Sequence, residues 1–324
     1  MAVQRLGLLS TANINRMILA GAASSDRVEV FAVASRDAER AEAYAAEHGI
    51  PRWHGSYEAL LGDADVDAVY ISLPNGMHHA WTMRALECGK HVLCEKPYTR
   101  HPTEAEQAYD AADAAGLVLM EAFMYRHHPQ TATIERLARE GAVGRVLAVK
   151  AVFSFPLTDL TNVRALPELE GGALMDVGCY CVSGSRLVAG DPVSVLAEQV
   201  VGETGVDMAL YGTLRFPREV VAQIEASFLA PERQFLEVVG DGGVLRAFAP
   251  WRVDWGGDLV LERDGVSEVV AVREANSYTL ELENLAAAVA GHGYALLGRA
   301  DAVAQARVID ALYRSAAEHA AVAL

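Results

Sequence analysis

A lysine directly after a short apolar strand is the first candidate for chemistry in this sequence. Residues 91–97 read His-Val-Leu-Cys-Glu-Lys-Pro, and Val92–Cys94 predict a buried strand that runs into Lys96 and Pro97. An open α/β sheet binds its ligands at the carboxyl ends of its strands, so the position of Lys96 suits a catalytic cation. A surface lysine at a strand end is the alternative explanation.

A second candidate site lies at the first turn between a strand and a helix. Gln4–Leu9 predict the strand, and backbone N–H groups at the start of the following helix can hold a pyrophosphate. The usual G-x-G-x-x-G fingerprint appears as Ser10-x-Ala12-x-x-Asn15, which keeps small residues at the first two positions. An ordinary turn is the alternative. The residues expected to contact a dinucleotide here are Ser10, Thr11, Ala12, Asn13 and Ile14.

The end of the next strand carries the signal for the type of cofactor. Val28–Ala34 predict this strand, and Ser35, Arg36 and Asp37 follow it. An acidic residue at this point binds the ribose 2′-hydroxyl of NAD, whereas an arginine accommodates the 2′-phosphate of NADP. Ser35 and Arg36 therefore predict NADP, with NAD as the alternative. Asp37 is expected to cap the next helix, although it could also turn toward the ribose.

Strands and helices alternate through residue 122. Val66–Leu73 predict another buried strand, which ends at the loop Pro74–His79. A helix at Glu104–Ala115 then leads to the strand Leu117–Met120. Strands joined by helices need crossover connections, which produce a parallel sheet. We therefore expect a Rossmann dinucleotide-binding domain in residues 1–122.

The pattern changes after residue 122. Long strand-like runs joined by short turns predict a large, mostly antiparallel open sheet, and two helices follow it. The expected strands are Val146–Phe155, Val193–Val201, Met208–Phe216, Val220–Phe228, Phe235–Val239 and Leu259–Val272, and the expected helices are Tyr278–Ala290 and Ala302–Ala320. The fold class is therefore α/β, with an α+β domain at residues 123–324 whose C-terminal helix can pack back on the first domain.

Composition narrows the range of partners. The 324 residues carry a formal net charge of −16, which opposes binding to the phosphate backbone of nucleic acids. We see no uncharged apolar stretch of ~18 residues that would span a bilayer and no signal peptide, so we expect a cytoplasmic protein without a membrane partner. Cys88, Cys94, Cys179 and Cys181 form no CxxC pair, so we interpret them as reduced core thiols and expect no metal site.

Three motifs carry a resemblance to one enzyme family. They are Glu95-Lys96-Pro97, the nine residues Glu121–Pro129 that read EAFMYRHHP, and the ten residues Gly171–Tyr180 that read GGALMDVGCY. In this order and spacing the chain resembles the glucose–fructose oxidoreductase, inositol dehydrogenase and rhizopine catabolism (Gfo/Idh/MocA) family of NAD(P)-dependent oxidoreductases. The second and third motifs are most similar to the branch of D-xylose 1-dehydrogenases and dimeric dihydrodiol dehydrogenases.

The resemblance implies roles for three residues. Lys96 approaches the nicotinamide and the substrate hydroxyl, Tyr180 exchanges the substrate proton, and Asp176 orients substrate and lysine. A tyrosine with a pKa of about 10 is a poor base at neutral pH, and a nearby ammonium group favours its phenolate. Without the motif, Tyr180 would read as a core residue of a helix. Pro97 resembles the cis-proline of the family.

Further cofactor contacts are implied by the same resemblance. Asn75 and His78 match loop positions near the ribose and the nicotinamide, although His78 could instead cap its helix. Arg126 matches a position at the floor of the cleft. The expected cofactor-binding residues in this part of the chain are Leu73, Pro74, Asn75, His78, Glu95, Lys96 and Arg126.

These features predict an NADP-preferring dehydrogenase that oxidises a monosaccharide, at its C1 hemiacetal, to a lactone. The alternatives are a 3-ketoreductase of a nucleotide-linked deoxysugar, a dihydrodiol dehydrogenase, and a dinucleotide sensor without turnover. Selectivity is expected to come from the loops Leu157–Gly172 and Arg246–Gly257. Trp251 and Trp255 are candidate stacking platforms for a sugar, or buried parts of a subunit contact.

The predicted C-terminal sheet also implies an assembly. Helices are expected to cover one of its faces and leave an apolar face open. The residues expected on that open face are Val220, Ala222, Ile224, Ala226 and Phe228. A face-to-face homodimer or a homotetramer through this sheet would bury them, and members of the family commonly pair in this way.

Overall fold

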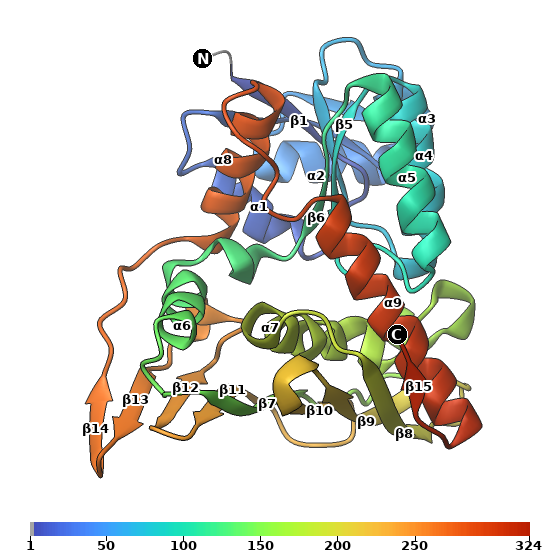
Figure 1. The fold of residues 1–324 in the computed structure, drawn as a ribbon. Coiled ribbons are helices and arrows are strands. Elements are labelled where there is room, and N and C mark those ends of the chain that lie inside the picture. The colour runs from blue at the N-terminus through green and yellow to red at the C-terminus, as the bar shows by residue number, and fades with distance from the viewer. Residues whose placement is uncertain (1–2) are drawn as a thin grey trace. The chain divides into compact units, whose positions relative to one another are not determined.

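The computed structural model describes residues 3–324 and contains two sheets, each in one of the two units into which the chain divides (Figure 1). The first unit holds the residues up to Thr99 together with Thr103–His127 and Asn276–Val303. The second unit holds Arg100–Pro102, His128–Ala275 and Ala304–Leu324. A late segment of the chain therefore returns to the N-terminal sheet.

The sheet of the first unit is entirely parallel. Its strand order is β3-β2-β1-β4-β5-β6, so the order reverses between β1 and β4, where open α/β sheets bind their ligands. The strands are β1 (Gln4–Leu8), β2 (Val28–Ala34), β3 (Arg52–His54), β4 (Ala68–Ile71), β5 (His91–Glu95) and β6 (Leu119–Ala122). The prediction of a Rossmann-type parallel sheet is confirmed, although β3 was not predicted.

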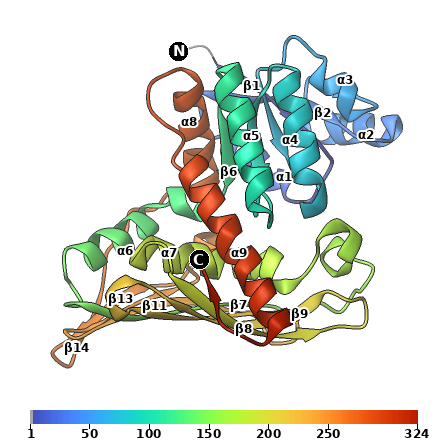
Figure 2. The same ribbon diagram turned by 45° about the vertical axis from the view of Figure 1, so that its right-hand side comes forward.

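Helices cover both faces of this parallel sheet, so its strands are buried on both sides. One face packs against α3, α4 and α5, which Figure 2 shows beside the sheet, and α1 and α8 contact each other and β2. The helices are α1 (Asn15–Ala22), α2 (Ala38–His48), α3 (Tyr57–Leu61), α4 (His78–Glu87), α5 (Pro102–Ala115) and α8 (Ser277–Val289), with short 3₁₀ turns η1 (Asn75–Met77) and η2 (Met124–His127).

The second unit is built on a nine-stranded sheet, in which every neighbouring pair is antiparallel except β7 and β10. The strand order is β14-β13-β12-β11-β7-β10-β9-β8-β15. The strands are β7 (Val146–Ser154), β8 (Ser194–Val201), β9 (Asp207–Arg215), β10 (Val221–Ser227), β11 (Arg233–Gly240), β12 (Val244–Phe248), β13 (Leu259–Arg263), β14 (Val266–Val269) and β15 (Val322–Ala323).

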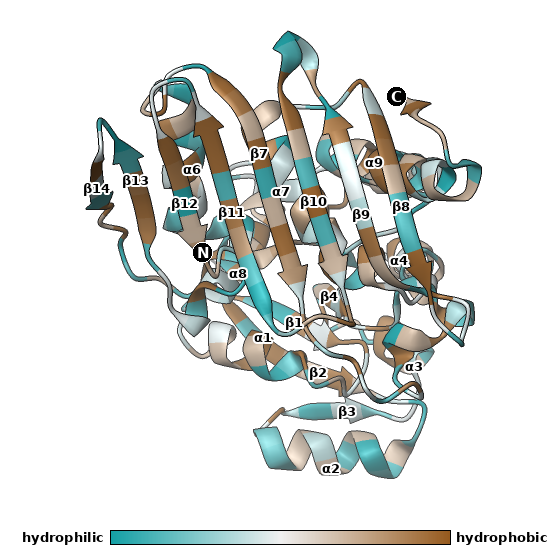
Figure 3. Cartoon of the chain, turned by 90° about the horizontal axis from the view of Figure 1, so that it is seen from below, coloured by the Kyte–Doolittle hydropathy of each residue, from teal (hydrophilic) through white to brown (hydrophobic). Residues whose placement is uncertain are grey.

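Helices lie on one face of this sheet and leave the other open, as Figure 3 shows from the strand side. They are α6 (Pro129–Arg139), a π-helical turn η5 (Leu174–Gly178), α7 (Cys179–Ala189) and the later part of α9 (Arg299–Glu318). Short 3₁₀ turns are η3 (Val163–Ala165), η4 (Pro167–Leu169), η6 (Pro217–Glu219) and η7 (Val253–Trp255). The mostly antiparallel open sheet is confirmed.

The single long strand predicted at Leu259–Val272 is wrong. The structure has a hairpin there, in which β13 and β14 pair around a two-residue loop, Asp264-Gly265. Both loop residues have positive φ, 52° for Asp264 and 76° for Gly265, which suits the tight turn of a hairpin. Asp-Gly is a strong hairpin signal, so the sequence contained the information. Strand β12 was also not predicted.

The prediction of which side of β10 lies open is also wrong. Val220, Ala222, Ile224, Ala226 and Phe228 are all buried in a single chain, on the side that contacts α7 and the π turn. The intervening residues Gln223 and Glu225 face the open side. Side chains alternate between the two faces of a strand. The apolar residues of β10 were assigned from the sequence to the open face instead of the helix-covered face, so the expected face is wrong for every residue of the strand.

Two of the side chains singled out in the sequence, Cys88 and Trp251, differ from expectation, whereas Trp255 does not. Cys88 is exposed, so the expectation of four core thiols is wrong for this residue, although none of the four cysteines forms a disulfide. Trp251 is completely buried, and its Nε1 donates to the Val152 carbonyl oxygen at 3.0 Å, so its ring offers no face to a sugar. Trp255 remains 46% exposed, with the Arg252 guanidinium 4.5 Å from the centre of its ring.

Candidate active site

The turn after β1 is closed by a network of buried polar side chains. The Asn15 side-chain amide donates to the Ser10 carbonyl oxygen at 2.7 Å, and the Ser72 hydroxyl donates to Asn15 Oδ1 at 2.7 Å. The Ser10 hydroxyl lies 2.7 Å from that of Ser72 and accepts from the Ala12 N–H at 3.1 Å. Ser10 and Asn15, which replace glycines of the fingerprint, therefore hold the turn together with their side chains.

The same turn leads into the N-terminus of α1. Its first flanking residue, Ile14, makes no side-chain cap, and Asn13 is exposed beside the partly exposed Thr11 and Ala12. Backbone N–H groups at such a helix start attract an anion. The Ser10 hydroxyl is bonded inside the protein, so its side chain shapes the turn. The N–H groups of Asn15, Arg16 and Met17 donate to carbonyl oxygens of the turn at 3.1, 3.4 and 2.9 Å, so the backbone of residues 11–14 is the part that suits a pyrophosphate.

The end of β2 presents two arginines. Arg36 is exposed directly after the strand, and Arg40 follows one helical turn later on α2. Asp37 caps α2, because its carboxylate accepts from the Arg40 N–H at 3.2 Å. The carboxylate that could have bound a ribose hydroxyl is therefore engaged in capping the helix.

Lys96 follows the end of β5, and a buried histidine fixes its loop. His78 has its Nδ1 2.9 Å from the Pro97 carbonyl oxygen and its Nε2 2.8 Å from the Leu73 carbonyl oxygen. Burial lowers the pKa of His78. Both ring nitrogens thus face backbone oxygens, so His78 joins the loops after β4 and β5. The peptide bond between Lys96 and Pro97 is cis, as the resemblance implied.

The remaining predicted cofactor residues of the first unit surround this loop. Glu95 accepts from the buried hydroxyl of Tyr70, and its other oxygen lies 3.3 Å from the Lys96 backbone nitrogen. Pro74 and Asn75 are partly exposed where η1 begins, whereas Leu73 is buried. Arg126, mostly buried in η2, lies 3.6 Å from Asp301 at the start of α9.

Asp176 and Tyr180 lie four residues apart on the helical segment of the second unit. Asp176 is in the π turn, a feature often found at functional sites, and Tyr180 is in the first turn of α7. Tyr180 is 6% exposed, and its ring centre lies 5.6 Å from that of Phe153 and 6.0 Å from that of Trp251. Burial against two aromatic rings restricts the movement of the Tyr180 ring.

A buried carboxylate anchors this helical segment. Asp207, at the start of β9, accepts from the Leu174 N–H at 2.7 Å and from the Tyr313 hydroxyl at 2.9 Å. Burial raises the pKa of Asp207 to about 6. Gly172 has a φ of 125°, and a Cβ there would lie 2.0 Å from Asp207 Oδ1. The glycine in the third motif is therefore required for the anchor.

The candidate residues fall into two groups, one in each unit. Lys96 and the predicted dinucleotide contacts belong to the first, and Asp176 and Tyr180 belong to the second. The pairing of Lys96 with Tyr180 stays a prediction. Among residues 3–324, no group of three or more His, Cys, Asp or Glu side chains could hold a metal ion. None of the helices described is long and apolar enough to cross a membrane.

Sequence reasoning missed three residues that organise these groups. Asn15 was read only as a departure from the glycine fingerprint, and Asp207 carries no motif of its own. Arg164 was also missed, although its Nε lies 2.6 Å from Asp176 Oδ2. Spacing along the chain indicates neither Asp207 nor Arg164, because only the folded loop and strand bring them to the third motif.

Comparison with known proteins agrees with the two-part fold of the chain. Residues 6–123 match the oxidoreductase family with an NAD-binding Rossmann fold, and residues 131–246 match the GFO/IDH/MocA C-terminal domain. The chain is 41% identical to D-xylose 1-dehydrogenase (NADP(+)) 2 of Haloferax volcanii, over 98% of this chain and 99% of the relative.

Two solved structures are similar over nearly the full length of both chains. A 3-ketoreductase from Actinomadura kijaniata, in complex with NADP and TDP-benzene, has a TM-score of 0.92 and 29% identity, over 97% of this chain and 98% of the other. An aldose-aldose oxidoreductase from Caulobacter crescentus, complexed with glycerol, has a TM-score of 0.93 and 26% identity, over all of both chains.

Proposed function

Because the chain belongs to the GFO/IDH/MocA oxidoreductase family, we propose that it is an NADP-preferring dehydrogenase that oxidises an aldose at C1 to the lactone. The observation that carries the proposal is the pair of Asp176 and Tyr180 on one anchored helical segment, in a chain that also places Lys96 at the end of a parallel strand. The full-length similarity to a D-xylose 1-dehydrogenase supports the same substrate class.

The residues of the first unit fit a dinucleotide phosphate. We assign the backbone of the turn that leads into α1 to the pyrophosphate, and Arg36 with Arg40 offers positive charge for a 2′-phosphate. The Asp37 carboxylate, which would repel that phosphate, is held by its own helix. Asn75 and Arg126 are the polar side chains that we assign to the ribose and nicotinamide end.

In the proposed mechanism, Tyr180 takes the proton of the C1 hydroxyl while the hydrogen on C1 leaves with its electron pair. A bound nicotinamide cofactor supplies the hydride-accepting carbon. Lys96 favours the phenolate form of Tyr180 by its positive charge, and Asp176 accepts a hydrogen bond from a second sugar hydroxyl. The products are the lactone, the reduced cofactor and one proton held at first by Tyr180.

A second candidate function is reduction of a 3-keto group on a nucleotide-linked deoxysugar. The similarity to the 3-ketoreductase of Actinomadura kijaniata favours it. The same three residues would then run the chemistry in reverse, with Tyr180 donating the proton. Oxidation of an arene dihydrodiol is a third possibility, and a sensor without turnover is disfavoured by the presence of Lys96, Asp176 and Tyr180 together.

A substrate screen tests these functions. Aldoses, dihydrodiols and keto-sugars are offered with NADP(H) and with NAD(H), and the nicotinamide absorbance is followed. Turnover of D-xylose or another aldose with NADP is the expected result. Turnover of keto-sugars alone would support the ketoreductase, and no turnover in any class would revive the sensor.

We also propose a division of labour within the chain. Residues 1–122 bind most of the cofactor, with Arg126 as a further contact just beyond them, and residues 123–324 bind the sugar and form the subunit contact, with the C-terminal helix returning to the first domain. The positions of Ser10, Arg36 and Lys96 in the first span and of Asp176 and Tyr180 in the second support this division. We propose that the enzyme works in the cytoplasm.

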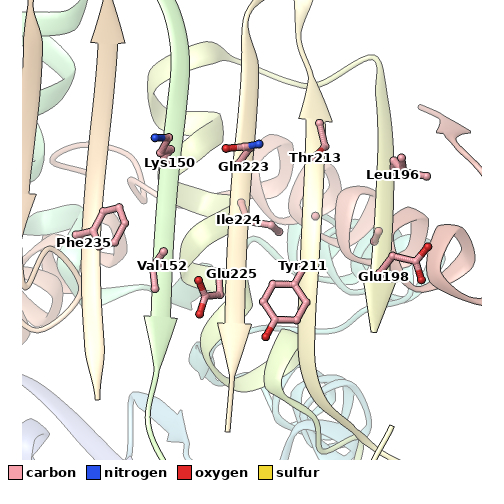
Figure 4. Close-up of a pocket in the computed structure, with 12 residues that line it drawn as sticks. Lys150, Val152, Leu196, Glu198, Tyr211, Thr213, Gln223, Ile224, Glu225 and Phe235 are labelled. Carbon is pink, nitrogen blue, oxygen red and sulfur yellow. The ribbon is translucent and has the colours of Figure 1, made fainter. Parts of the chain in front are cut away.

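We propose that the open face of the nine-stranded sheet pairs with a second copy of the chain, in a homodimer or homotetramer. Figure 4 shows side chains of this face on neighbouring strands, where aromatic and aliphatic groups of the kind enriched in subunit contacts lie beside charged ones. Leu196 and Tyr211 are 46% and 48% exposed on it. Leu196 and Tyr211, rather than the β10 residues expected from the sequence, are therefore the exposed apolar and aromatic residues of this face.

A further inference from the structure

The loop before the third motif holds one arginine against that motif. The loop connects β7 to the π turn, and Arg164 lies in its first 3₁₀ turn, where Asn162 Oδ1 accepts from the Arg164 N–H at 3.1 Å. The Gly172 N–H donates to the Arg164 carbonyl oxygen at 2.8 Å. A Cβ at Gly171 would lie 2.4 Å from the same oxygen. The two glycines of the motif therefore let the Arg164 backbone pack directly against them.

The end of the loop next to the third motif is also held by hydrogen bonds and ion pairs. Glu170, with a φ of 53°, has its Oε1 3.1 Å from Arg100 Nε and 3.0 Å from His101 Nε2. The Gly171 N–H donates to the Leu166 carbonyl oxygen at 3.0 Å. The backbone that carries Arg164 is thus fixed by hydrogen bonds on both sides.

The side chain of Arg164 is directed at the carboxylate that the mechanism uses. Its Nε lies 2.6 Å from Asp176 Oδ2, its Nη1 lies 3.5 Å from Asn162 Oδ1, and its guanidinium carbon lies 6.0 Å from the centre of the Phe155 ring. The side chain of Asp176 is only 15% exposed, whereas that of Arg164 is 42% exposed. A short, charge-assisted bond to a mostly buried carboxylate restricts that carboxylate more than an exposed ion pair would.

We propose that Arg164 is a positioning residue of the sugar site, which holds Asp176 ionised and aims it at a substrate hydroxyl. The proposal rests on the proposed function, because Asp176 is the sugar-orienting group there. Arg164 binds Asp176 through Oδ2, and its positive charge favours the carboxylate form, to which a sugar hydroxyl can donate. If the Asp176 carboxylate moved, the bound sugar would no longer be held with its reacting carbon in the productive orientation, and the reaction would be slower.

The first test is the titration of Asp176 itself. Carboxyl carbons of ¹³C-aspartate-labelled protein are followed by NMR against pH, and the Asp176 signal is assigned with Asp176→Asn. Arg164→Ala is expected to raise the pKa of Asp176, and Arg145→Ala is the matched control. Arg145 also lies close to an aspartate of the second unit, 3.5 Å from Asp241, and its side chain is 70% exposed. An unchanged Asp176 titration in Arg164→Ala overturns the inference, whatever the enzyme turns over.

The second test is kinetic. With the aldose that the screen identifies, Arg164→Ala should lower kcat/KM by roughly 10–100-fold and move the acid limb of its pH profile upward. Millimolar guanidinium should restore part of the loss in Arg164→Ala and nothing in Arg145→Ala, and Arg164→Lys should retain an intermediate value. If Tyr180→Phe abolishes turnover while Arg164→Ala matches Arg145→Ala, the function stands and the inference falls.

Discussion

At the scale of single residues, the chemistry depends on a phenol that must act as a base. Tyr180 packs against the rings of Phe153 and Trp251, so replacing it by phenylalanine keeps the packing and removes only the hydroxyl. Tyr180→Phe should therefore leave the fold and NADP affinity intact and lower kcat by roughly 10²–10⁴-fold, the usual worth of a positioned acid/base. Steady-state kinetics and cofactor titration by fluorescence measure both. Near-normal turnover would show that another group carries the proton.

The partner of this tyrosine is tested by the pH profile. Lys96→Met removes the charge and keeps a similar side-chain length. It should lower kcat and move the basic limb of the pH–rate profile upward, because the phenolate loses its stabilising cation. If the pH–rate profile does not move in Lys96→Met while the chemical step limits the rate, then Lys96 does not stabilise the Tyr180 phenolate.

Cofactor choice is also decided by single residues. Arg36→Ala should weaken NADP binding by about 1.5–3 kcal/mol, the worth of a hydrogen bond to a charged group, and change NAD binding little. Arg27→Ala is the matched control, because Arg27 is also exposed but lies just before β2, at the opposite end of the strand. Calorimetric titration with both cofactors measures the difference. Equal losses for NADP and NAD in Arg36→Ala would refute the assignment.

At the scale of elements, the helical segment with Asp176 and Tyr180 depends on the buried carboxyl of Asp207. Its pKa is raised from 3.8 to about 6 by burial, so the folded state binds more protons than the unfolded chain between these pH values. The free energy of unfolding therefore falls as the pH rises through this window, by up to about 3 kcal/mol from this group. At neutral pH, Asp207 is ionised while buried, so its hydrogen bonds hold the helical segment but its ionisation lowers the free energy of unfolding.

Asp207→Asn tests this linkage. The amide keeps an oxygen that can accept from the Leu174 N–H and removes the ionisation, so the variant should gain stability relative to wild type between pH 4 and pH 7. Denaturant unfolding at several pH values measures the difference. Asp264→Asn, in the exposed hairpin turn, is the control and should follow wild type throughout. A constant difference between Asp207→Asn and wild type would contradict the raised pKa.

At the scale of the whole molecule, the open face of the second sheet should determine the assembly. Tyr211→Lys places a charge on that face and should shift a dimer or tetramer toward monomer, since a charge buried at a contact is costly. Tyr294→Lys makes the same change at a residue that is 93% exposed in the first unit, and should have no effect. Light scattering at micromolar concentration distinguishes these outcomes. A wild-type protein that is only monomeric would end the proposal.

The sequence by itself determined the features that depend on local pattern. Alternating strands and helices indicated the parallel sheet, and short turns between strand-like runs indicated the antiparallel one. The motifs predict Lys96, Asp176 and Tyr180 as site residues, and this assignment stays a prediction. The hairpin at Asp264-Gly265 could have been predicted by the same reasoning, because Asp-Gly is a local turn signal. Each of these signals lies within a few neighbouring residues, so no knowledge of distant contacts is needed.

Only the tertiary structure decided which side chains from distant segments of the chain contact one another. It turned the Ser10 hydroxyl toward Ser72, covered one side of β10 with helices, and brought Arg164 and Asp207 to the third motif. A period-two strand pattern is the same whichever face is covered, and a hydroxyl or carboxylate can bind any suitable donor that folding brings near. The choice among those partners is made by the packing of the whole chain.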